Sequence, residues 1–584
     1  MPRGVQLPTT PDVEEPDPSA HLTYDDLAAE ELVYILDEDD EALHKTDVAM
    51  GVNNVTAKSE ALEPSSVTDA RSRPDWSQWA RGIREELDTL KRTGTWELVD
   101  PPPGANIVGS KWVFRAKKDA AGNVVRHKAR LVAQGFSQVP GVDYFDTFAP
   151  VATLSSIRTV LATAARLDYE LHQIDIKGAY LNGELNDDEV IYMRQPPGFE
   201  SEAHPNKVCR LRKTLYGLKQ SGRRWYQRLV KILVDNLRFT QCAVDQAVFY
   251  RRKTTNDHII VVVHVDDCTI AAKSLKEIED FKRAIEEHVE ITDLGELHWL
   301  LGIEVTRNRD ERVISLSQQS YLESIIRRFG FEDLKPVSTP MDPSTKLHSS
   351  QSPSTGTESA KMHHVPYREA VRSLMYASLA TRPDISYAVS TVSRFSSKPG
   401  IPHWDAVKRI YKYLIGTKNL KLTYGGAQSA LTGYTDADGS MAEDRRAVSG
   451  YAFLIDGGAV SWSSRRQPIV SLSTTESEYI AATHAAQEAL WLRSFIAELF
   501  GPLAEPTTLF SDNQSAIALT KNYQFHARTK HIDVRFHFIR WVVENNKLRL
   551  IYCPTADMVA DTLTKALPSP KVKHFAVELG LRST

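Results

Sequence analysis

The chain has 584 residues, of which 42% are hydrophobic and 25% are charged, an ordinary composition for a globular protein of several domains. Its four cysteines are scattered, which excludes a disulfide framework or a zinc knuckle and is typical of a reducing compartment. The longest apolar stretch, around Ile259–Val263, is far too short to span a bilayer, and the N-terminus lacks the pattern of a secretory signal.

The net charge of −4 hides an asymmetry between the two ends of the chain. Residues 1–70 contain 17 acidic and 3 basic side chains, a net charge of −14, and the remainder carries +10. A mildly basic body suits a polyanionic partner, although +10 over so long a chain is also unremarkable. With scattered prolines and few aromatics, residues 1–72 are predicted to form a mostly disordered acidic linker or tail, in which Tyr24–Leu43 could form a short helix.

Regular structure is predicted to begin near Pro74. Apolar residues at helical spacing predict the first helix, and they are Trp76, Trp79, Ile83, Leu87 and Leu90. Runs bounded by turn residues predict strands at residues 95–99, 111–115, 126–132, 171–176, 249–250 and 259–270, with a hairpin turn at 119–122. Amphipathic stretches predict helices at 157–167, 225–237, 275–288 and 319–329, the first of them capped by Ser155 or Ser156.

The second half of the chain is predicted to hold two further units. Residues 346–366 are rich in Ser, Thr and Pro and are interpreted as a linker that ends the unit at 73–345. Residues 367–428 form a helical connection, to which we assign no chemistry. From residue 429 to 584 the pattern changes to strand, strand, long helix, strand and helix, which indicates a separate α/β domain.

Two adjacent acids interrupt the apolar run Val261–Ile270. Asp266 and Asp267 repel each other and resist burial, and a divalent cation between them would relieve both problems. The pair therefore suggests a metal-bound phosphoryl-transfer site at a tight hairpin, with an exposed turn as an equally good alternative. Asp175 would add a third carboxylate if its strand lay beside this hairpin; otherwise it simply ends an edge strand.

Four more acids are spaced through the C-terminal domain, and they are Asp436, Glu478, Asp512 and Asp561. Each also has a purely structural interpretation. Glu478 could complete a capping box with Thr475, and Asp512 could cap a helix that begins near Gln514. Asp561 suits the positive end of its helix, and Asp436 could be a turn acid.

Several motifs occur in order around these acids. Those ahead of the acid pair are Lys128–Phe136, Thr147–Val151, Gln173–Gly183 and Leu215–Gln220. Those in the last domain are Tyr451–Leu454, Ser461–Ser464, Lys530–Arg535 and Pro554–Asp561. Together, from about Pro74 to the C-terminus, they resemble the reverse transcriptase of copia-type LTR retrotransposons and the ribonuclease H that follows it.

The resemblance implies an α+β and α/β multidomain fold, in which a right-hand polymerase with fingers, palm and thumb is followed by a ribonuclease H-like domain. Asp175, Asp266 and Asp267 match the catalytic, metal-binding aspartates of the polymerase. The ribonuclease H carboxylates, also catalytic and metal-binding, are matched by Asp436, Glu478, Asp512 and Asp561. Two Mg²⁺ ions per active site are implied, with Mn²⁺ as an alternative.

The same resemblance implies substrate-binding residues. Tyr180 matches the aromatic gate that excludes a ribose 2′-hydroxyl, and Gln220 and Ser221 match the loop beside the nucleotide and template. Lys128 and Arg130 match the fingers cations that neutralise the triphosphate. Without the motifs, a core tyrosine, a polar turn before a helix and a solvated strand face would be the ordinary interpretations.

The sequence departs from the family pattern at several positions. His264 stands where tyrosine is usual, and we expect a packed strand histidine there more than a third metal ligand. Gly439 replaces the usual tryptophan, Met441 and Ala442 replace a Gly-Asp pair, and Arg446-Ala-Val replaces Lys-Ser-Thr. His531 could contact substrate or be structural.

The leading hypothesis is therefore an RNA-directed DNA polymerase with a ribonuclease H that degrades the RNA of RNA–DNA hybrids. Its expected partners are an RNA template, a DNA primer, the hybrid and deoxynucleotide triphosphates, with the integrase or capsid of the same element as further candidates and no membrane. The resemblance implies a cytoplasmic virus-like particle with nuclear entry. A catalytically inactive or host-captured nucleic-acid-binding remnant is the rival, against which the presence of all seven carboxylates argues.

Overall fold

The computed structural model describes residues 63–118, 124–254, 257–426, 430–439, 445–521 and 533–583. The predicted helix at Tyr24–Leu43, the turn at 119–122, the Met441–Ala442 departure and His531 all lie outside these residues. Within the range predicted to be a tail, helix α4 (Val67–Ser72) begins after Ser66, whose side chain accepts a hydrogen bond from the Asp69 N–H. The Glu63 carboxylate is buried and lies 2.6 Å from Arg115, so regular structure begins earlier than predicted.

The first part of the chain carries two small sheets and a helix. Helix α5 (Trp76–Arg92) buries the predicted apolar stripe, with Trp79 and Ile83 fully enclosed. A long hairpin of strands β3 and β4 packs against this helix, and a four-stranded sheet has the order β1-β7-β6-β2. The strands are β1 (Trp96–Val99), β2 (Ile107–Val108), β3 (Ser110–Lys118), β4 (Val124–Ala133), β6 (Tyr192–Met193) and β7 (Val208–Leu211).

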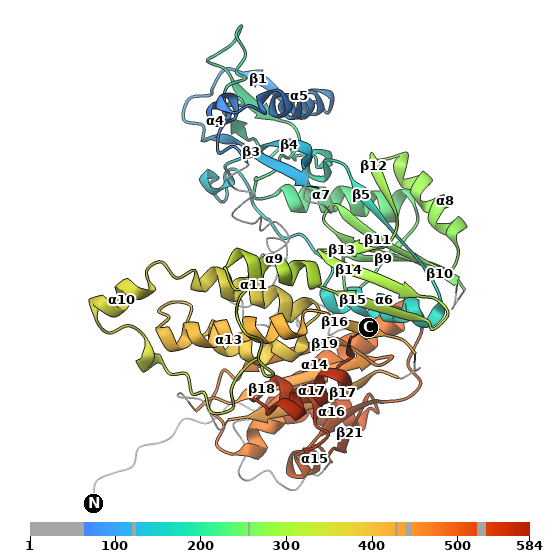
Figure 1. The fold of residues 1–584 in the computed structure, drawn as a ribbon. Coiled ribbons are helices and arrows are strands. Elements are labelled where there is room, and N and C mark those ends of the chain that lie inside the picture. Colours follow the sequence, from blue (N-terminus) through green and yellow to red (C-terminus); the bar gives the residue numbers. More distant parts are fainter. Residues whose placement is uncertain are drawn as a thin grey trace, which may run out of the picture. The chain divides into compact units, whose positions relative to one another are not determined.

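A six-stranded sheet of order β12-β5-β11-β10-β9-β8 follows, next to helices α6, α7 and α8 (Figure 1). Its strands are β5 (Glu170–Ile176), β8 (Thr240–Gln241), β9 (Val248–Thr254), β10 (Asp257–His264), β11 (Asp267–Ala272) and β12 (Ile291–Glu296). The helices are α6 (Leu154–Leu167), the short η2 (Ala179–Asn182), α7 (Ser221–Val230) with its π-helical extension η3 (Lys231–Asn236), and α8 (Leu275–Glu286). This sheet has the central antiparallel pair β10–β11 that a polymerase palm requires.

A five-stranded sheet joins segments that lie far apart in the sequence. Its order is β13-β14-β15-β16-β22, and its strands are β13 (Trp299–Leu300), β14 (Ile303–Asn308), β15 (Val313–Ser317), β16 (Leu420–Tyr424) and β22 (Leu581–Ser583). Sequence analysis missed this sheet because its strands are short and because β16 pairs with β15 and β22 across more than a hundred residues. The predicted polymerase, connection and C-terminal units thus share one sheet, while the domain boundaries themselves stay a prediction.

Helices dominate residues 319–417. Three of them precede the predicted connection: α9 (Gln319–Arg328), η4 (Ser349–Gln351) and α10 (Gly356–Met362). Two of these, η4 and α10, lie within the stretch interpreted as a linker. The stretch predicted as the helical connection, residues 367–428, is mostly helical, with α11 (Tyr367–Ala380), η5 (Pro383–Ile385), α12 (Ser386–Ser393) and α13 (Ile401–Thr417), and it also contributes strand β16. A fully buried ion pair, Arg382 to Asp384 at 2.7 Å, also receives the Tyr413 hydroxyl and holds the middle of this helical layer together.

The C-terminal sheet has the order β19-β18-β17-β20-β21, antiparallel in its first three strands and parallel in the rest. Its strands are β17 (Thr432–Asp438), β18 (Val448–Ile455), β19 (Gly458–Arg466), β20 (Thr507–Ser511) and β21 (Leu548–Tyr552). The accompanying helices are α14 (Thr474–Phe500), α15 (Gln514–Lys521), α16 (Asp533–Glu544), η8 (Val559–Leu563) and α17 (Ser569–Glu578). This mixed sheet with flanking helices confirms the ribonuclease H-like fold, including β19, which the predicted strand pattern omitted. No helix among the described residues is both long enough and apolar enough to traverse a bilayer.

Three helix caps differ from the expected ones. Thr153, rather than Ser155 or Ser156, caps α6 by accepting the Ser156 N–H. Ser473, rather than Thr475, caps α14, so Glu478 takes no part in that cap. Asn513, rather than Asp512, accepts the Ala516 N–H at the start of α15. In each case the N-cap is the residue immediately before the first helical turn, as capping geometry requires.

Arg158 connects three parts of the chain. From α6 its guanidinium donates to the Val460 carbonyl at 2.7 Å and to the Leu379 and Ala380 carbonyls at 2.7 and 3.1 Å. It also lies over the Trp462 ring at 3.9 Å, and burial lowers its pKa to about 10. Because three buried carbonyls depend on one side chain, Arg158 anchors the palm to the connection and to strand β19.

We expect Arg158→Met to lower the free energy of unfolding by about 3–5 kcal/mol, since the substitution leaves buried carbonyls without donors. Urea denaturation of the full chain measures this change. Lys276→Met, at an exposed position of α8, is the matched control and should stay within about 0.5 kcal/mol of wild type. Equal losses in the two variants would contradict the anchoring role.

Candidate active sites

The predicted polymerase aspartates meet at one end of the palm sheet. Asp267 begins β11 and lies directly opposite Asp175 of β5 in the antiparallel register, which places their Cα atoms about 5 Å apart. Asp266 occupies the two-residue turn between β10 and β11, and its carbonyl accepts the Ile176 N–H at 2.9 Å. The strand that carries Asp175 therefore lies directly beside the hairpin of Asp266 and Asp267, as a shared site requires.

The turn itself is strained and firmly held. Val265 has a φ of 62°, in a region that β-branched residues avoid. The neighbouring Asp266 does not have a positive φ. The Val265 carbonyl accepts the indole N–H of Trp225 at 2.7 Å, so α7 and β5 grip the turn from two sides. This rigidity fixes the Asp266 carboxylate relative to Asp175.

The three carboxylates share one electrostatic environment. Burial raises the pKa of the Cys268 thiol, and Asp267, Asp266 and Asp175 raise it further. Gln173, two residues before Asp175 on the same face of β5, donates to Asp267 at 3.2 Å. Their oxygens do not form a set within 4.8 Å of one another; in the described part of the chain only the ribonuclease H-like domain has such a group.

The predicted gate residue Tyr180 lies near Asp266, and the predicted triphosphate residue Arg130 lies over the ring that packs on Tyr180. The Tyr180 and Tyr216 rings meet edge to face with centroids 5.1 Å apart, and the Arg130 guanidinium lies 4.5 Å from the Tyr216 centroid. The pKa of Tyr180 is raised by burial and by Asp266, and lowered in part by Arg130. Lys128 is half-buried two positions before Arg130 on β4.

Gln220 and Ser221 point into the protein. Gln220 is fully buried, accepting from Gln138 Nε2 at 3.1 Å and donating to the Asp143 carbonyl at 2.8 Å. The buried Ser221 hydroxyl donates to the Leu215 carbonyl at 2.6 Å. Their predicted contact with nucleotide and template stays a prediction, and the structure adds that both side chains fix their loop from inside.

His264 is buried at the end of β10, paired across the hairpin with Asp267. Burial lowers the pKa of its imidazole, which opposes a charged role there. Its position matches a packed strand histidine. At the other departure, a Cβ added at Gly439 would make only ordinary van der Waals contacts, with Ala447.

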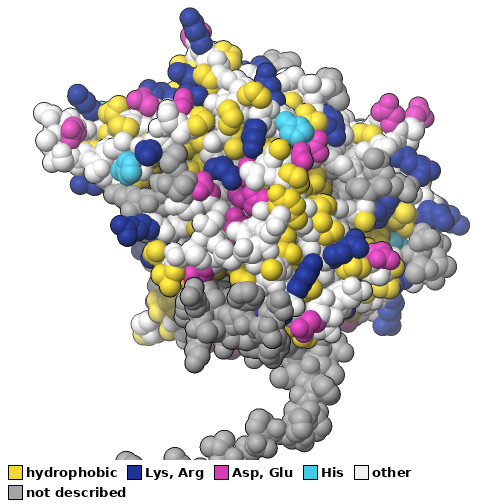
Figure 2. All heavy atoms as spheres, turned by 90° about the horizontal axis from the view of Figure 1, so that it is seen from below, with side chains coloured by type: hydrophobic (Ala, Val, Ile, Leu, Met, Phe, Trp, Pro, Cys, Tyr) yellow, Lys and Arg dark blue, Asp and Glu magenta, His cyan; other side chains and the backbone are white. Residues whose placement is uncertain are grey.

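The second group of acids converges more tightly. Asp436 on β17, Asp512 after β20 and Asp561 on η8 offer carboxylate oxygens that all lie within 4.8 Å of one another. Glu478, in the second turn of α14, lies outside that group but senses it, because Asp436 and Asp512 both raise its pKa. Figure 2 views the chain from the end that carries this domain and shows acidic side chains gathered near the middle of that face.

Burial raises the pKa of three of these carboxyl groups, those of Asp436, Glu478 and Asp561. Desolvation first, and then the neighbouring carboxylates, raise the pKa of Glu478 to about 9, and desolvation raises that of Asp436 to about 6. One oxygen of Glu478 is buried without a hydrogen-bond partner. Asp436 receives the Thr564 hydroxyl, and Asp512 accepts from Thr555 at 2.8 Å.

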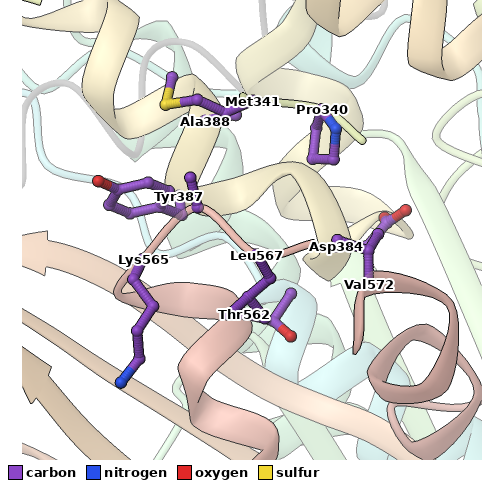
Figure 3. A pocket seen from close by; sticks show the side chains of 10 residues that line it. Pro340, Met341, Asp384, Tyr387, Ala388, Thr562, Lys565, Leu567 and Val572 are labelled. Atoms are coloured by element: carbon purple, nitrogen blue, oxygen red, sulfur yellow. The ribbon is translucent and has the colours of Figure 1, made fainter. Parts of the chain in front are cut away.

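Two lysines that sequence analysis missed complete this site. Lys565 lies 2.9 Å from Asp561 and 3.5 Å from Asp436, and Lys571 lies 3.7 Å from Asp561. The spacing of four residues between Asp561 and Lys565 is the signal that could have found the first. Lys565 also borders a small cavity, whose other walls include Tyr387 of the connection and Met341, which precedes the predicted linker (Figure 3).

The residues of both sites fit a divalent cation. Carboxylate oxygens are the donors that Mg²⁺ and Mn²⁺ prefer. The unpartnered buried oxygen of Glu478 and the mutual repulsion of three acids within 4.8 Å are costs that a cation would remove. The arrangement as a whole, a palm sheet with paired aspartates followed by a ribonuclease H-like sheet with four acids, is that of a reverse transcriptase.

Comparisons with known proteins agree. Residues 93–343 match the family described as "Reverse transcriptase (RNA-dependent DNA polymerase)". The Pol polyprotein from transposon TNT 1-94 of Nicotiana tabacum is 43% identical over 528 residues, 90% of this chain and 39% of that protein. The putative transposon Ty5-1 protein of Saccharomyces cerevisiae is 32% identical over 318 residues, 54% of this chain and 100% of that protein.

The chain belongs to the reverse transcriptase family of copia-type LTR retrotransposon polyproteins. It spans about two fifths of the tobacco relative's length. Among solved structures, the foamy viral protease-reverse transcriptase in complex with an RNA/DNA hybrid is similar with a TM-score of 0.44 and 13% identity, over 81% of this chain and 53% of that one.

The raised carboxyl pKa values predict how stability depends on pH without metal. The folded chain holds protons that the unfolded chain releases, from pH 4.5 to about 9 at Glu478 and from 3.8 to about 6 at Asp436. Stability should therefore fall as pH rises through these windows. Glu478→Gln should flatten the fall and gain roughly a few kcal/mol at pH 8 in the unfolding free energy.

Urea denaturation in EDTA across this pH range is the measurement. Glu311→Gln, at an exposed position, serves as the matched control and should keep the wild-type slope. A Glu478→Gln profile parallel to wild type would mean that this carboxyl is not destabilised in the folded chain.

Proposed function

We propose that the chain is an RNA-directed DNA polymerase with a C-terminal ribonuclease H that degrades the RNA strand of RNA–DNA hybrids. The observation that carries this proposal is the register that sets Asp267 opposite Asp175 beside the strained Asp266 turn. It occurs in a chain that belongs to the reverse transcriptase family. The convergence of Asp436, Asp512 and Asp561 in the last domain, with Glu478 near enough for two of them to raise its pKa, supports the second activity.

In the polymerase site, Asp175, Asp266 and Asp267 would hold the divalent cations. When bound, such cations would sharpen the attacking hydroxyl or water and neutralise the leaving group in either site. The half-buried Tyr180 ring, braced by Tyr216, would leave no room for a ribose 2′-hydroxyl. Arg130 and Lys128 would bind the triphosphate of the incoming deoxynucleotide.

In the ribonuclease H-like site, Asp436, Asp512, Asp561 and Glu478 would hold the cations. The protonated form that the raised pKa of Glu478 favours would give way to the carboxylate when positive charge arrives. Lys565 and Lys571 sit where they would attract the RNA phosphates to the acids, since both side chains lie at the rim with about a third of their surface exposed.

Partners and localisation follow from this proposal. An RNA template, a DNA primer and their hybrid would be the nucleic-acid partners, and the integrase or capsid of the same element would be protein partners. A cytoplasmic virus-like particle with nuclear entry is the proposed location, which fits free, buried cysteines at 209, 242, 268 and 553.

Asp266→Asn should reduce Mg²⁺-dependent extension of an oligo-dT primer on poly-rA by about a thousandfold or more, because it removes charge from the centre of the trio. Its cleavage of RNA in a hybrid should stay at the wild-type rate. Asp280→Asn, on the exposed face of α8, is the control that keeps both activities. Extension by the Asp266 variant equal to wild type would reject the polymerase.

Asp512→Asn should produce the opposite separation. Cleavage of labelled RNA in a hybrid should fall by about a thousandfold or more, whereas primer extension should continue. Asp557→Asn, exposed and only four residues before Asp561, is the matched control. If wild type binds the hybrid but neither extends nor cleaves in Mg²⁺ or Mn²⁺, the inactive remnant is the correct interpretation.

A further inference from the structure

The segment at residues 135–151, hereafter the inverted loop, reverses the usual placement of polar and apolar side chains. Its exposed members include several large apolar side chains beside the polar Asp146 and Thr147: Phe136 is 79% exposed, Phe145 60% and Val142 58%. Its buried members are polar, with Gln138 at 6% and Asp143 at 2%. A folded chain normally buries such side chains, so several large apolar groups left exposed within one short segment point to a binding site.

The inverted loop is held in this conformation by hydrogen bonds. Asp143 accepts from Asn106 at 2.6 Å and from the Val139 N–H at 2.7 Å. Gln138 donates to Gln220, and its own oxygen accepts the Lys219 N–H at 2.8 Å. The aromatic rings are therefore presented outward by a braced backbone, which reduces the ordering cost of binding.

Both ends of the inverted loop lead to the polymerase site. At its start, Gly135 packs so closely on the Gly217 carbonyl that an added Cβ would lie 2.1 Å from that oxygen. Gly217 follows Tyr216, the residue that braces the Tyr180 gate. At its end, Pro150 and Val151 line a small cavity together with Val265 of the strained turn. The loop that carries the exposed rings is thus packed at both ends against elements of the candidate polymerase site.

The inverted loop also adjoins an unusually basic stretch. Residues 207–231, which include the loop before α7 and α7 itself, contain nine Lys or Arg and no Asp or Glu. Arg223 of α7 bridges to Asp146 of the inverted loop at 3.0 Å and donates to the Phe148 carbonyl at 3.3 Å. Lys219 beside Gln138 is exposed. The surroundings therefore suit a polyanion more than an apolar protein surface.

We propose that the inverted loop is a stacking platform for unpaired bases of the template strand, with Phe136 and Phe145 as its principal rings. Exposed aromatic side chains next to a basic surface are the means by which proteins bind single-stranded nucleic acid without reading its sequence. The inference deepens the proposed polymerase function and rests on it, because only a templated polymerase needs to hold the strand ahead of its active site. Apolar Val142 between the rings extends the platform.

The test uses the full chain and a primer–template with an unpaired 5′ template extension, compared with a blunt duplex of the same paired sequence. Fluorescence anisotropy in EDTA, without nucleotide, measures the two dissociation constants. Phe136→Leu combined with Phe145→Leu should raise the Kd for the extended substrate about tenfold and leave that for the blunt duplex unchanged. Phe136→Tyr combined with Phe145→Tyr should restore tight binding, because it restores the rings.

A second readout reports stacking directly. 2-Aminopurine placed in the unpaired template should be quenched by wild type and by the Tyr variant, and much less by the Leu variant. Leu275→Ala, at a half-exposed position of α8, is the control for loss of a surface apolar side chain and should behave as wild type. Circular dichroism melting of each variant verifies the fold.

Unchanged binding and quenching in the Leu variant would overturn the platform. So would a dimer in wild-type sedimentation velocity that the Leu variant converts to a monomer while its Kd values stay at wild type, because the patch would then be an interface between copies of the chain. Neither result depends on catalysis. If the Leu variant binds and quenches like wild type while extension still depends on Asp266, the platform is rejected and the polymerase proposal is kept. If the Leu variant loses binding and quenching but extension does not depend on Asp266, the platform is kept and the polymerase proposal is rejected.

Discussion

Like-charged carboxylates held close together are the constraint on which this structure depends. Each site must keep its acids in place against mutual repulsion, and in the ribonuclease H-like domain against desolvation as well, which side chains on mobile segments could not do. The polymerase trio therefore sits on paired strands and a gripped turn, where β5, β11 and the Trp225 indole fix the backbone. The ribonuclease H-like group draws on β17, β20, α14 and η8, so its cost is spread over the whole domain.

The two candidate sites are also supported by structure that they have in common. The five-stranded sheet combines strands from the predicted polymerase, connection and C-terminal units, and β22 closes it with the last described residues of the chain. Arg158 binds carbonyls of the other two units, and Glu498 of α14 accepts the Ala243 N–H at 2.9 Å. Cores that interlock in this way transmit rigidity, so neither site relies on its local elements alone.

The sequence predicts most of the elements and the composition of both acid groups, because apolar spacing and motif order are local properties. The stripe from Trp76 to Leu90 and the strand that ends near Asp175 are of this kind. What depends on distant contacts is missed. The pairing of β15 with β16 spans about a hundred residues, and nothing near Ser155 shows that Thr153 will cap α6. Lys565 was overlooked because its role exists only once η8 carries Asp561 to Asp436.

The places where local rules fail are informative for the same reason. Val265 takes a backbone conformation that its side chain disfavours, Glu478 keeps a buried oxygen without a partner, and Phe136 is left in water. Each of these features lowers stability. Such features occur where the surrounding packing offsets the loss and where a bound ligand would stabilise them. All three lie at or beside the candidate sites, and the ligands that would repay them differ: a primer end at the turn, a cation at the carboxylate, a base at the ring.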